Sequence, residues 1–214
     1  KNNLDFFKKE ILKIPKKLTW EIKKIEIYSE KLKKDKILNF ENNNKILFYM
    51  VKNDELYKLL NNELLKSKFF KKNIIKQENF YDKFLNKNNY DLIINCDQNN
   101  QISKKFFSKK IDKDYKNLAY TTILAHRKLE NNSAIQVFTG SGPIAFLPIS
   151  NTKTSVVCSL DTHNKNYEDY EIIELINKHN PKFEIKKILK LSNFNLKSSN
   201  LRNYYSENIL SFGD

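Results

Sequence analysis

Four apolar runs follow one another through the middle of the chain, and only a few polar residues separate each run from the next. The runs cover residues 115–128, 134–139, 144–149 and 155–160. Their length, their β-branched and aromatic residues and the turn-forming residues between them predict β-strands. Because the connections are short, we expect consecutive strands to pair as an antiparallel meander.

The segment from Ala134 to Ile149 carries no charged residue, although charged residues make up 30% of the sequence. Its two apolar runs flank Thr-Gly-Ser-Gly-Pro at residues 139–143. Glycine tolerates positive φ and proline fixes φ near about −65°, so these residues predict a tight turn. By itself, the segment is explained by a buried β-hairpin in a core sheet.

Three segments space their apolar residues as an amphipathic helix does, at residues 4–14, 53–67 and 167–179. The expected apolar faces are Leu4, Phe7, Ile11 and Ile14; Leu56, Leu59, Leu60 and Leu64; and Tyr170, Ile173 and Ile176. In the second helix Asn53 is the expected N-cap, and two acids follow it at the positive end of the helix dipole.

Shorter apolar runs predict the remaining strands. Alternating apolar residues predict one strand over 18–27, and residues 37–40 and 46–51 predict a strand pair around a polar turn. Further strands are expected at 183–191 and 194–196.

Two apolar runs end at an acid. Residues 90–97 read Tyr-Asp-Leu-Ile-Ile-Asn-Cys-Asp, and residues 208–214 end in Gly-Asp. The first predicts a strand buried on both faces, as in a parallel α/β sheet, which binds ligands at the carboxyl ends of its strands. One Asp at a strand end is usually a turn residue. Asp97 and Asp214 together point to a shared ligand at the edge of one sheet.

The formal net charge is +14, and among the 39 basic residues only Arg127 and Arg202 are arginine. Phosphate and base recognition favours the arginine fork, and the lysines are spread along the chain. We therefore interpret most of this charge as solvated surface and expect no nucleic-acid partner. The alternative is a basic nucleic-acid-binding protein, which would bind with a steep salt dependence.

Cysteine and histidine predict no metal site or disulfide. His126, His163 and His179 lack the spacing of metal ligands. Cys96 and Cys158 lie in apolar runs, which predicts buried free thiols in a reducing compartment. No apolar run approaches the roughly 18 residues of a transmembrane helix.

The hairpin segment resembles a signature of the FAD-dependent aromatic hydroxylases, most closely the ubiquinone-biosynthesis hydroxylases of the p-hydroxybenzoate-hydroxylase-like superfamily. That signature reads A-x-Q-x-F…G-P-x-A-x-L-P, and the matching residues are Ala134, Gln136, Phe138, Gly142, Pro143, Ala145, Leu147 and Pro148. Residues 156–159 follow where the family has V-V-W-[ST]. Residues 49–60 are similar to its entry into the helix beside the flavin, 91–97 to the strand before its D-G motif, and 209–214 to the start of its G-D-A-A-H motif.

The chain also departs from the family pattern. Gln98 stands where the family has glycine, and Gln101 and Lys104 stand where serine and arginine normally follow. These changes put the second nucleotide-contacting motif, and efficient use of NAD(P)H, in question. The family's opening G-x-G-x-x-G is absent and the G-D motif stops at its Asp, so we expect an internal segment of a longer protein that holds FAD poorly by itself.

The resemblance implies an α/β fold of mixed α+β character, in which a partial FAD-binding α/β domain is interleaved with an antiparallel β-sheet substrate domain. Residues 53–104 and 198–214 would belong to the FAD-binding domain. Residues 1–52 and 105–197 would belong to the substrate domain.

The resemblance further implies a flavin-dependent monooxygenase that uses FAD, NAD(P)H and O₂ to hydroxylate the ring of a polyprenyl phenol in ubiquinone biosynthesis. The residues expected to face the cofactor are Asp97, Gly213 and Asp214. The candidates to line the substrate pocket are Gln136, Phe138 and Phe146, because strand alternation decides which of them point inward.

A lipid-tailed substrate and a basic surface favour a cytoplasmic protein in peripheral contact with the inner membrane, in a complex with other ubiquinone-biosynthesis proteins. The alternative is a non-catalytic module that binds an apolar ligand or a protein and keeps a decayed nucleotide site. Gln98 favours that alternative.

Overall fold

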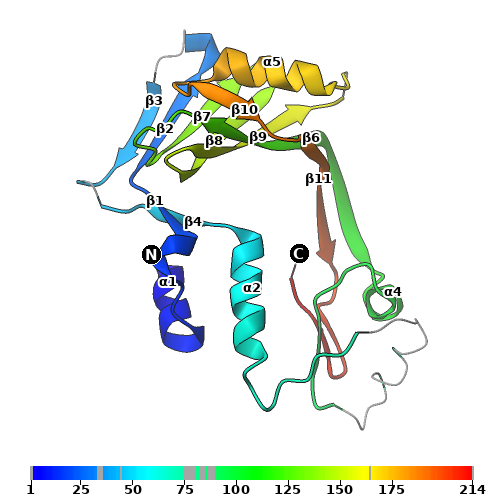
Figure 1. The fold of residues 1–214 in the computed structure, drawn as a ribbon. Helices are drawn as coiled ribbons and strands as arrows, with labels where there is room; N and C mark the ends of the chain where they lie inside the picture. Colours follow the sequence, from blue (N-terminus) through cyan, green and yellow to red (C-terminus); the bar gives the residue numbers. More distant parts are fainter. Residues whose placement is uncertain are drawn as a thin grey trace. The chain divides into compact units, whose positions relative to one another are not determined.

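Figure 1 shows the protein as a computed structural model, which describes residues 2–32, 36–43, 45–74, 81, 85, 90–163 and 165–213. The predicted role of Asp214 lies outside the described residues. The chain divides into two units, Lys1–Lys66 with Lys116–Leu196 and Ser67–Tyr115 with Lys197–Asp214.

Two strands, β6 (Lys110–His126) and β11 (Ser192–Leu201), each run from one unit into the other. Helix α2 (Asn53–Leu64) groups with the first unit, and residues 105–115 group with the second. The division expected from the sequence differs at both places. The assignment of flavin and substrate roles to the two units stays a prediction.

The first unit is built on a mixed sheet in the order β10–β6–β9–β8–β7–β2–β3, with β11 paired to β6. Its other strands are β2 (Lys24–Ser29), β3 (Lys36–Glu41), β7 (Ser133–Thr139), β8 (Gly142–Ser150), β9 (Lys153–Asp161) and β10 (Ile185–Ile188). Strands therefore dominate and few helices accompany them, which confirms the expected mixed α+β class.

Strands β7, β8 and β9 form the expected antiparallel meander. The expectation that β6 pairs with β7 is wrong, because β6 pairs with β9 and β7 pairs parallel with β2. Asn131, in the connection between β6 and β7, accounts for this path. Its buried side-chain Nδ2 donates to the carbonyl oxygens of Ser150 and Lys153 at the β8–β9 turn. The connection is thus held against that turn, and β7 joins the sheet beyond β8.

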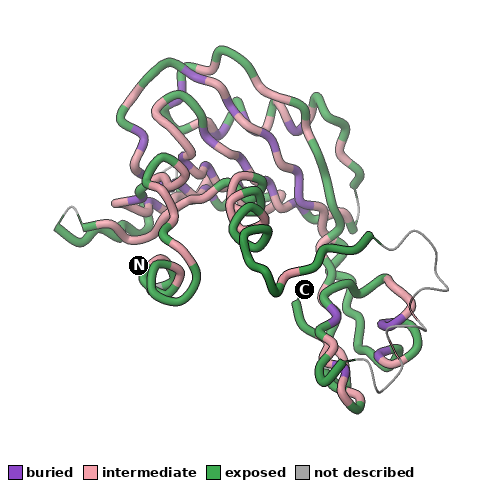
Figure 2. Tube along the Cα trace, turned by 60° about the horizontal axis from the view of Figure 1, so that its bottom comes forward, coloured by how far each residue is buried: buried purple, intermediate pink, exposed green. Residues whose placement is uncertain are grey.

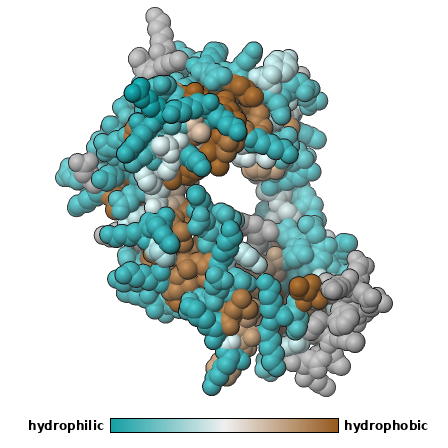
Figure 3. All heavy atoms as spheres, in the orientation of Figure 1, coloured by the Kyte–Doolittle hydropathy of each residue, from teal (hydrophilic) through white to brown (hydrophobic). Residues whose placement is uncertain are grey.

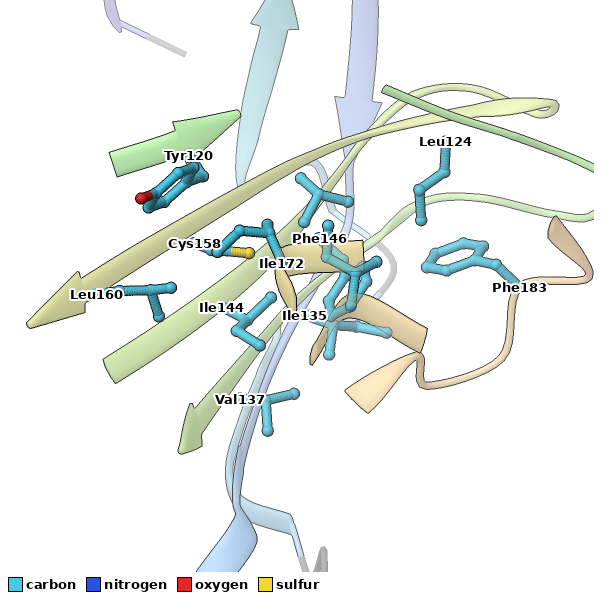
Figure 4. Packing of buried hydrophobic residues seen from close by; sticks show 12 residues of the cluster. Tyr120, Leu124, Ile135, Val137, Ile144, Phe146, Cys158, Leu160, Ile172 and Phe183 are labelled. Atoms are coloured by element: carbon cyan, nitrogen blue, oxygen red, sulfur yellow. The ribbon is translucent and has the colours of Figure 1, made fainter. Parts of the chain in front are cut away.

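Helix α5 (Asp169–His179) covers one face of this sheet (Figure 1). A capping box between Glu168 and Glu171 begins the helix. Ile172 and Ile176 are fully buried, and Figure 4 shows Ile172 among the side chains of the sheet. The predicted face is wrong at Tyr170, which is 64% exposed. The buried face instead includes His179, a residue that a count of apolar positions leaves out.

Buried positions alternate along the central strands, as Figure 2 shows. Buried residues of the sheet and of α5, together with Phe183, form the core of the unit. They are Tyr120, Leu124, Ile135, Val137, Ile144, Phe146, Val156, Cys158, Leu160, Ile172, Ile176 and Phe183.

Near the N-terminus, β1 (Thr19–Ile22) pairs with β4 (Phe48–Val51) in a separate two-stranded sheet, while β2 pairs with β3. The predicted single strand over 18–27 is therefore wrong, and so is the predicted pairing of 37–40 with 46–51. Lys23 interrupts the strand, and its backbone N–H donates to the Asn132 carbonyl oxygen at 2.9 Å. The chain leaves one sheet for the other at this residue.

The remaining helices of this unit are short or partly exposed. Helix α1 (Asn2–Phe6) continues as a π-helix over Phe7–Ile11, and 3₁₀ turns lie at Lys16–Leu18 and Glu30–Leu32. The prediction that Asn53 caps α2 is wrong, because Lys52 is the N-cap residue and no side chain caps the helix. Leu64, at the end of the predicted apolar face of α2, is 50% exposed.

The second unit contains a three-stranded sheet in the order β12–β13–β5. Its strands are β12 (Tyr205–Ser206), β13 (Ile209–Ser211) and β5 (Ile93–Asn95), and helix α4 spans Gln101–Phe106. Strands β5 and β13 are parallel, as expected. The prediction that the β5 strand is buried on both faces is wrong, because Ile94 is 55% exposed. Only the face with Ile93 and Ile209 packs against the Ile102–Phe107 cluster among the described residues.

Candidate functional site

The candidate site lies at the carboxyl ends of β5 and β13. Asn95 is in register with Ser211, and the Phe212 N–H donates to the Asn95 carbonyl oxygen at 2.9 Å. Asp97 and Gly213 each come two residues later, so the parallel pairing brings both to one edge of the sheet. Carboxyl ends of parallel strands are where such sheets bind ligands.

A buried hydrogen-bond network holds this edge. The Asn95 side-chain Nδ2 donates to Ser103 Oγ at 2.7 Å and to the Asp97 carbonyl oxygen at 3.1 Å. Ser103 Oγ donates to the same carbonyl oxygen at 2.6 Å, and Asn100 Nδ2 donates to Asn95 Oδ1 at 2.6 Å. Asn100 Oδ1 also accepts from the Ser103 N–H and caps α4. The side chains of Asn95, Asn100 and Ser103 therefore hold the turn after β5 in place.

Asp97 is exposed, and its Oδ1 accepts from the Asn99 N–H at 2.8 Å. This geometry is the turn-forming arrangement that an Asp at a strand end commonly adopts. The carboxylate therefore shapes the turn and also presents a negative charge to solvent at the sheet edge.

A cavity of about 320 Å³ opens beside this edge. Its lining residues are Gln98, Asn99, Ser103, Lys104, Phe107, Ser108, Lys110, Leu201 and Ser211. Among the described residues, this lining holds two lysines and no carboxylate. Lys110 is paired with Asp112, whose Oδ2 lies 3.4 Å from its Nζ, so Lys104 is the lining lysine whose charge favours an anionic group.

Gly213 leaves the end of β13 open. Its φ is +102°, in the region that favours glycine, and a Cβ built at this position would meet no heavy atom of the described residues within 4 Å, apart from its chain neighbours. The backbone here is thus accessible to a ligand.

The candidate substrate-lining residues belong to the first unit and lie on two faces of its sheet. Gln136 and Phe138 alternate with the buried Ile135 and Val137, so they point away from α5. Phe146 is fully buried in the core beneath α5, with its ring 5.9 Å from that of Phe183. The structure therefore separates Phe146 from the other two candidates. A substrate-lining role stays a prediction for Gln136 and Phe138.

His126 forms a second buried polar network, within the first unit. Its Nδ1 lies 2.8 Å from the Arg127 carbonyl oxygen, which can only accept, so the network assigns the proton to Nδ1. Its Nε2 then accepts from Thr154 Oγ1 at 3.0 Å, and that hydroxyl accepts from Asn131 Nδ2 at 2.9 Å. This histidine is structural, as expected.

The sequence predicted no reactive role for His163 or for the two cysteines. His163 is exposed, and its ring Nδ1 lies 2.6 Å from Asp161 Oδ1. Hydrogen bonds from the backbone and the ring of His163 lower the pKa of Asp161. Cys158 is buried, and burial raises its pKa to about 12. Cys96 is exposed, so the prediction that both thiols are buried is wrong for Cys96. No group of three potential metal ligands occurs among the described residues.

Sequence reasoning missed the residues that fix the site, chiefly Asn95, Asn100, Ser103 and Lys110. Asn95 carried one signal, because it is the polar residue inside the apolar run Leu-Ile-Ile-Asn-Cys. A polar residue in a buried strand needs a partner, but the sequence does not say which.

Neither the comparison with known protein families nor that with curated proteins finds a match. Solved structures resemble the fold. A flavin-dependent brominase matches 100% of this chain and 58% of its own length at a TM-score of 0.62 and 11% identity. A 2-methyl-3-hydroxypyridine-5-carboxylic acid oxygenase matches 92% of this chain and 58% of its own at a TM-score of 0.59 and 11% identity.

A geranylgeranyl bacteriochlorophyll reductase-like protein from Thermoplasma acidophilum covers 96% of this chain and 58% of its own, with a TM-score of 0.62 and 12% identity. The chain thus spans less than two thirds of the length of these structures. At such identities the likeness shows the fold. Among the helices in the described part of the chain, none has the length and apolar character to cross a membrane.

Proposed function

We propose that this chain is part of a flavin-dependent monooxygenase and that its second unit holds part of the FAD. The observation that carries the proposal is the parallel pairing of β5 with β13, which brings Asp97 and the Gly213 backbone to one edge beside a lysine-lined cavity. Two of the structural neighbours, the brominase and the oxygenase, belong to oxidative enzyme classes, which supports this choice.

The residues at this edge fit a nucleotide cofactor. Lys104 suits its phosphates, the Asp97 carboxylate suits its sugar-like hydroxyls, and Gly213 leaves room for close approach. Lys110, which is paired with Asp112, adds positive charge to the cavity lining only in part. A bound flavin would supply the redox chemistry with O₂ and NAD(P)H, while the protein residues bind and orient it. One feature weakens the fit, because Gln98 adds a side chain where the resembling family has glycine.

We further propose that the substrate is a polyprenyl phenol of ubiquinone biosynthesis and that Gln136 and Phe138 line its site. We also propose that the protein works in peripheral contact with an anionic membrane, together with other proteins of that biosynthesis. The face of the sheet opposite α5 supports this, because it is largely apolar and only half-buried. A basic surface suits an anionic membrane.

The test is flavin retention by the full-length protein that contains this chain. We expect a flavin absorbance band near ~450 nm in the purified protein. Lys104→Glu should weaken FAD binding by about tenfold, because it places a carboxylate in a cavity that suits phosphates. Lys128→Glu, an exposed lysine of the first unit, is the control and should leave flavin content unchanged. Equal retention in both variants would contradict the assignment of this cavity.

A non-catalytic binding module is the second candidate, and Gln98 is the observation that favours it. In that case the purified protein would carry no flavin band and Gln98→Gly would not create one. A flavin content that rises in Gln98→Gly would instead show that the site is a cofactor site impaired by this side chain.

A further inference from the structure

The face of the first unit's sheet that is turned away from α5 carries mostly apolar side chains. Residues opposite one another on neighbouring strands point to the same face. One such row crosses six strands and consists of Leu38, Ile27, Gln136, Ala145, Val157 and Thr121. Figure 3 shows hydrophobic residues gathered over the strands of this unit within a largely hydrophilic surface. Gln136 lies in the middle of the row.

Gln136 has apolar neighbours in every direction along the sheet. Ile27 and Ala145 flank it across the strands, and Ala134 and Phe138 flank it along its own strand. Its half-buried side-chain amide makes no hydrogen bond to any other described residue. By contrast, the hydroxyl of Thr121, the other polar member of the row, donates to the Ser192 carbonyl oxygen. The amide of Gln136 is therefore the unused polar group of this row.

The chemistry of an amide defines the ligand that would complement it. Its oxygen accepts one hydrogen bond and its NH₂ group donates, so a hydroxyl can both donate to it and accept from it. The half-buried amide can hydrogen-bond to water, and a ligand hydroxyl can replace those hydrogen bonds whereas an apolar substituent cannot. No charged side chain belongs to the row, so a carboxylate on the ligand would lack a counter-charge. The surface thus suits a flat, neutral, apolar ring that carries one hydroxyl.

We propose that Gln136 is a specificity-determining residue of this face, and that it selects neutral hydroxylated aromatic rings over the same rings without the hydroxyl. This inference rests on the proposed function, in which this face lines the substrate site. Phe138, 45% exposed on the same strand, can make apolar contact with the ring whether or not the ring carries the hydroxyl.

The experiment measures binding of 4-propylphenol and of the nearly isosteric 4-propyltoluene by ligand-observed NMR, with the full-length protein. The wild-type protein should bind the phenol about fivefold more tightly, the ratio for one net hydrogen bond. Gln136→Met, which keeps an unbranched side chain of similar size, should reduce this ratio to about one. Gln136→Glu keeps an acceptor and should retain the preference. Thr121→Val is the matched control on the same row and should retain it as well.

Equal binding of the two ligands by the wild-type protein would overturn the proposal, as would a phenol preference that survives in Gln136→Met. Binding of neither ligand would also overturn it. Flavin absorbance of the same preparations tests the proposed function separately. A protein without flavin whose phenol preference depends on Gln136 would refute the monooxygenase and leave the assignment of Gln136 standing.

Discussion

Gly140 and Gly142 stand two residues apart in one hairpin turn, yet the backbone requires only the second to be glycine. Gly142 has φ of +135°, and a Cβ built there would lie 2.0 Å from the Ser159 carbonyl oxygen on the neighbouring strand. Gly140 has neither constraint, since apart from its chain neighbours no heavy atom of the described residues lies within 4 Å of its Cβ position. The sequence predicted that the turn needs both glycines, whereas the structure requires glycine only at Gly142 and would accept another residue at Gly140.

This difference predicts opposite outcomes for two otherwise identical substitutions. Gly142→Ala should lower the free energy of unfolding by at least about 2 kcal/mol, because it adds both backbone strain and a steric clash. Gly140→Ala should change it by no more than about 0.5 kcal/mol. Urea unfolding followed by circular dichroism measures both. Similar midpoints for the two variants would show that β8 and β9 do not approach each other as closely as the structure has them.

The residues of the candidate site were only partly visible in the sequence. Asp97 and Gly213 could be identified because each follows an apolar run, and the strand rule then places them at one edge. Asn95, Asn100 and Ser103 could not be identified, because their importance lies in hydrogen bonds that form only after α4 folds back to the end of β5.

At the level of elements, α5 shows how periodicity can identify a helix and still misplace its buried face. Residues 170, 173 and 176 and residues 172, 176 and 179 both have helical spacing. Counting apolar residues favours the first set, because the second ends in His179. The structure buries the second set, and His179 lies 3.6 Å from Glu30, so this polar member has an acidic neighbour.

The two faces can be distinguished by truncation. Ile172→Ala should lower the free energy of unfolding by about 2–5 kcal/mol, because it empties space in a fully buried position. Tyr170→Ala should lower it by less than about 1 kcal/mol, since that side chain is 64% exposed. Thermal or urea unfolding of the two variants is the measurement. If Tyr170→Ala is the more damaging change, the helix has the orientation that the apolar count predicts.

Strand pairing was the least predictable level. The meander β7–β8–β9 follows from short connections, but the pairing of β6 with β9 depends on the buried contacts of Asn131 with the β8–β9 turn. The pairing of β1 with β4 likewise depends on a break at Lys23 that appears in the sequence only as a slip in alternation. Local pattern establishes strands, whereas contacts distant in sequence decide their partners.

For the molecule as a whole, the order of the segments carried more information than any one motif. Single matches such as residues 91–97 or 209–214 are short, but they occur in the order that the hydroxylase family shows. The structural likeness to the brominase, at a TM-score of 0.62 with 11% identity, extends over the whole chain. The sequence could thus indicate the fold, while a substrate cannot be deduced from a fold alone.

The net charge of +14 is a property of the whole molecule and would suit either an anionic membrane or nucleic acid. For peripheral membrane contact, we expect co-sedimentation with vesicles that contain anionic phosphatidylserine and none with neutral phosphatidylcholine vesicles. Binding should fall as salt rises, because the Debye length shrinks from roughly 30 Å at 0.01 M to roughly 3 Å at 1 M.

Duplex DNA is the informative competitor in this experiment. With two arginines among 39 basic residues, we expect no retention of DNA at about 0.15 M salt, where the anionic vesicles still bind. Retention of DNA with a steep salt slope would favour the nucleic-acid-binding alternative. Vesicle binding that persists at about 1 M salt would mean that apolar insertion, rather than lysine charge, attaches the protein to the membrane.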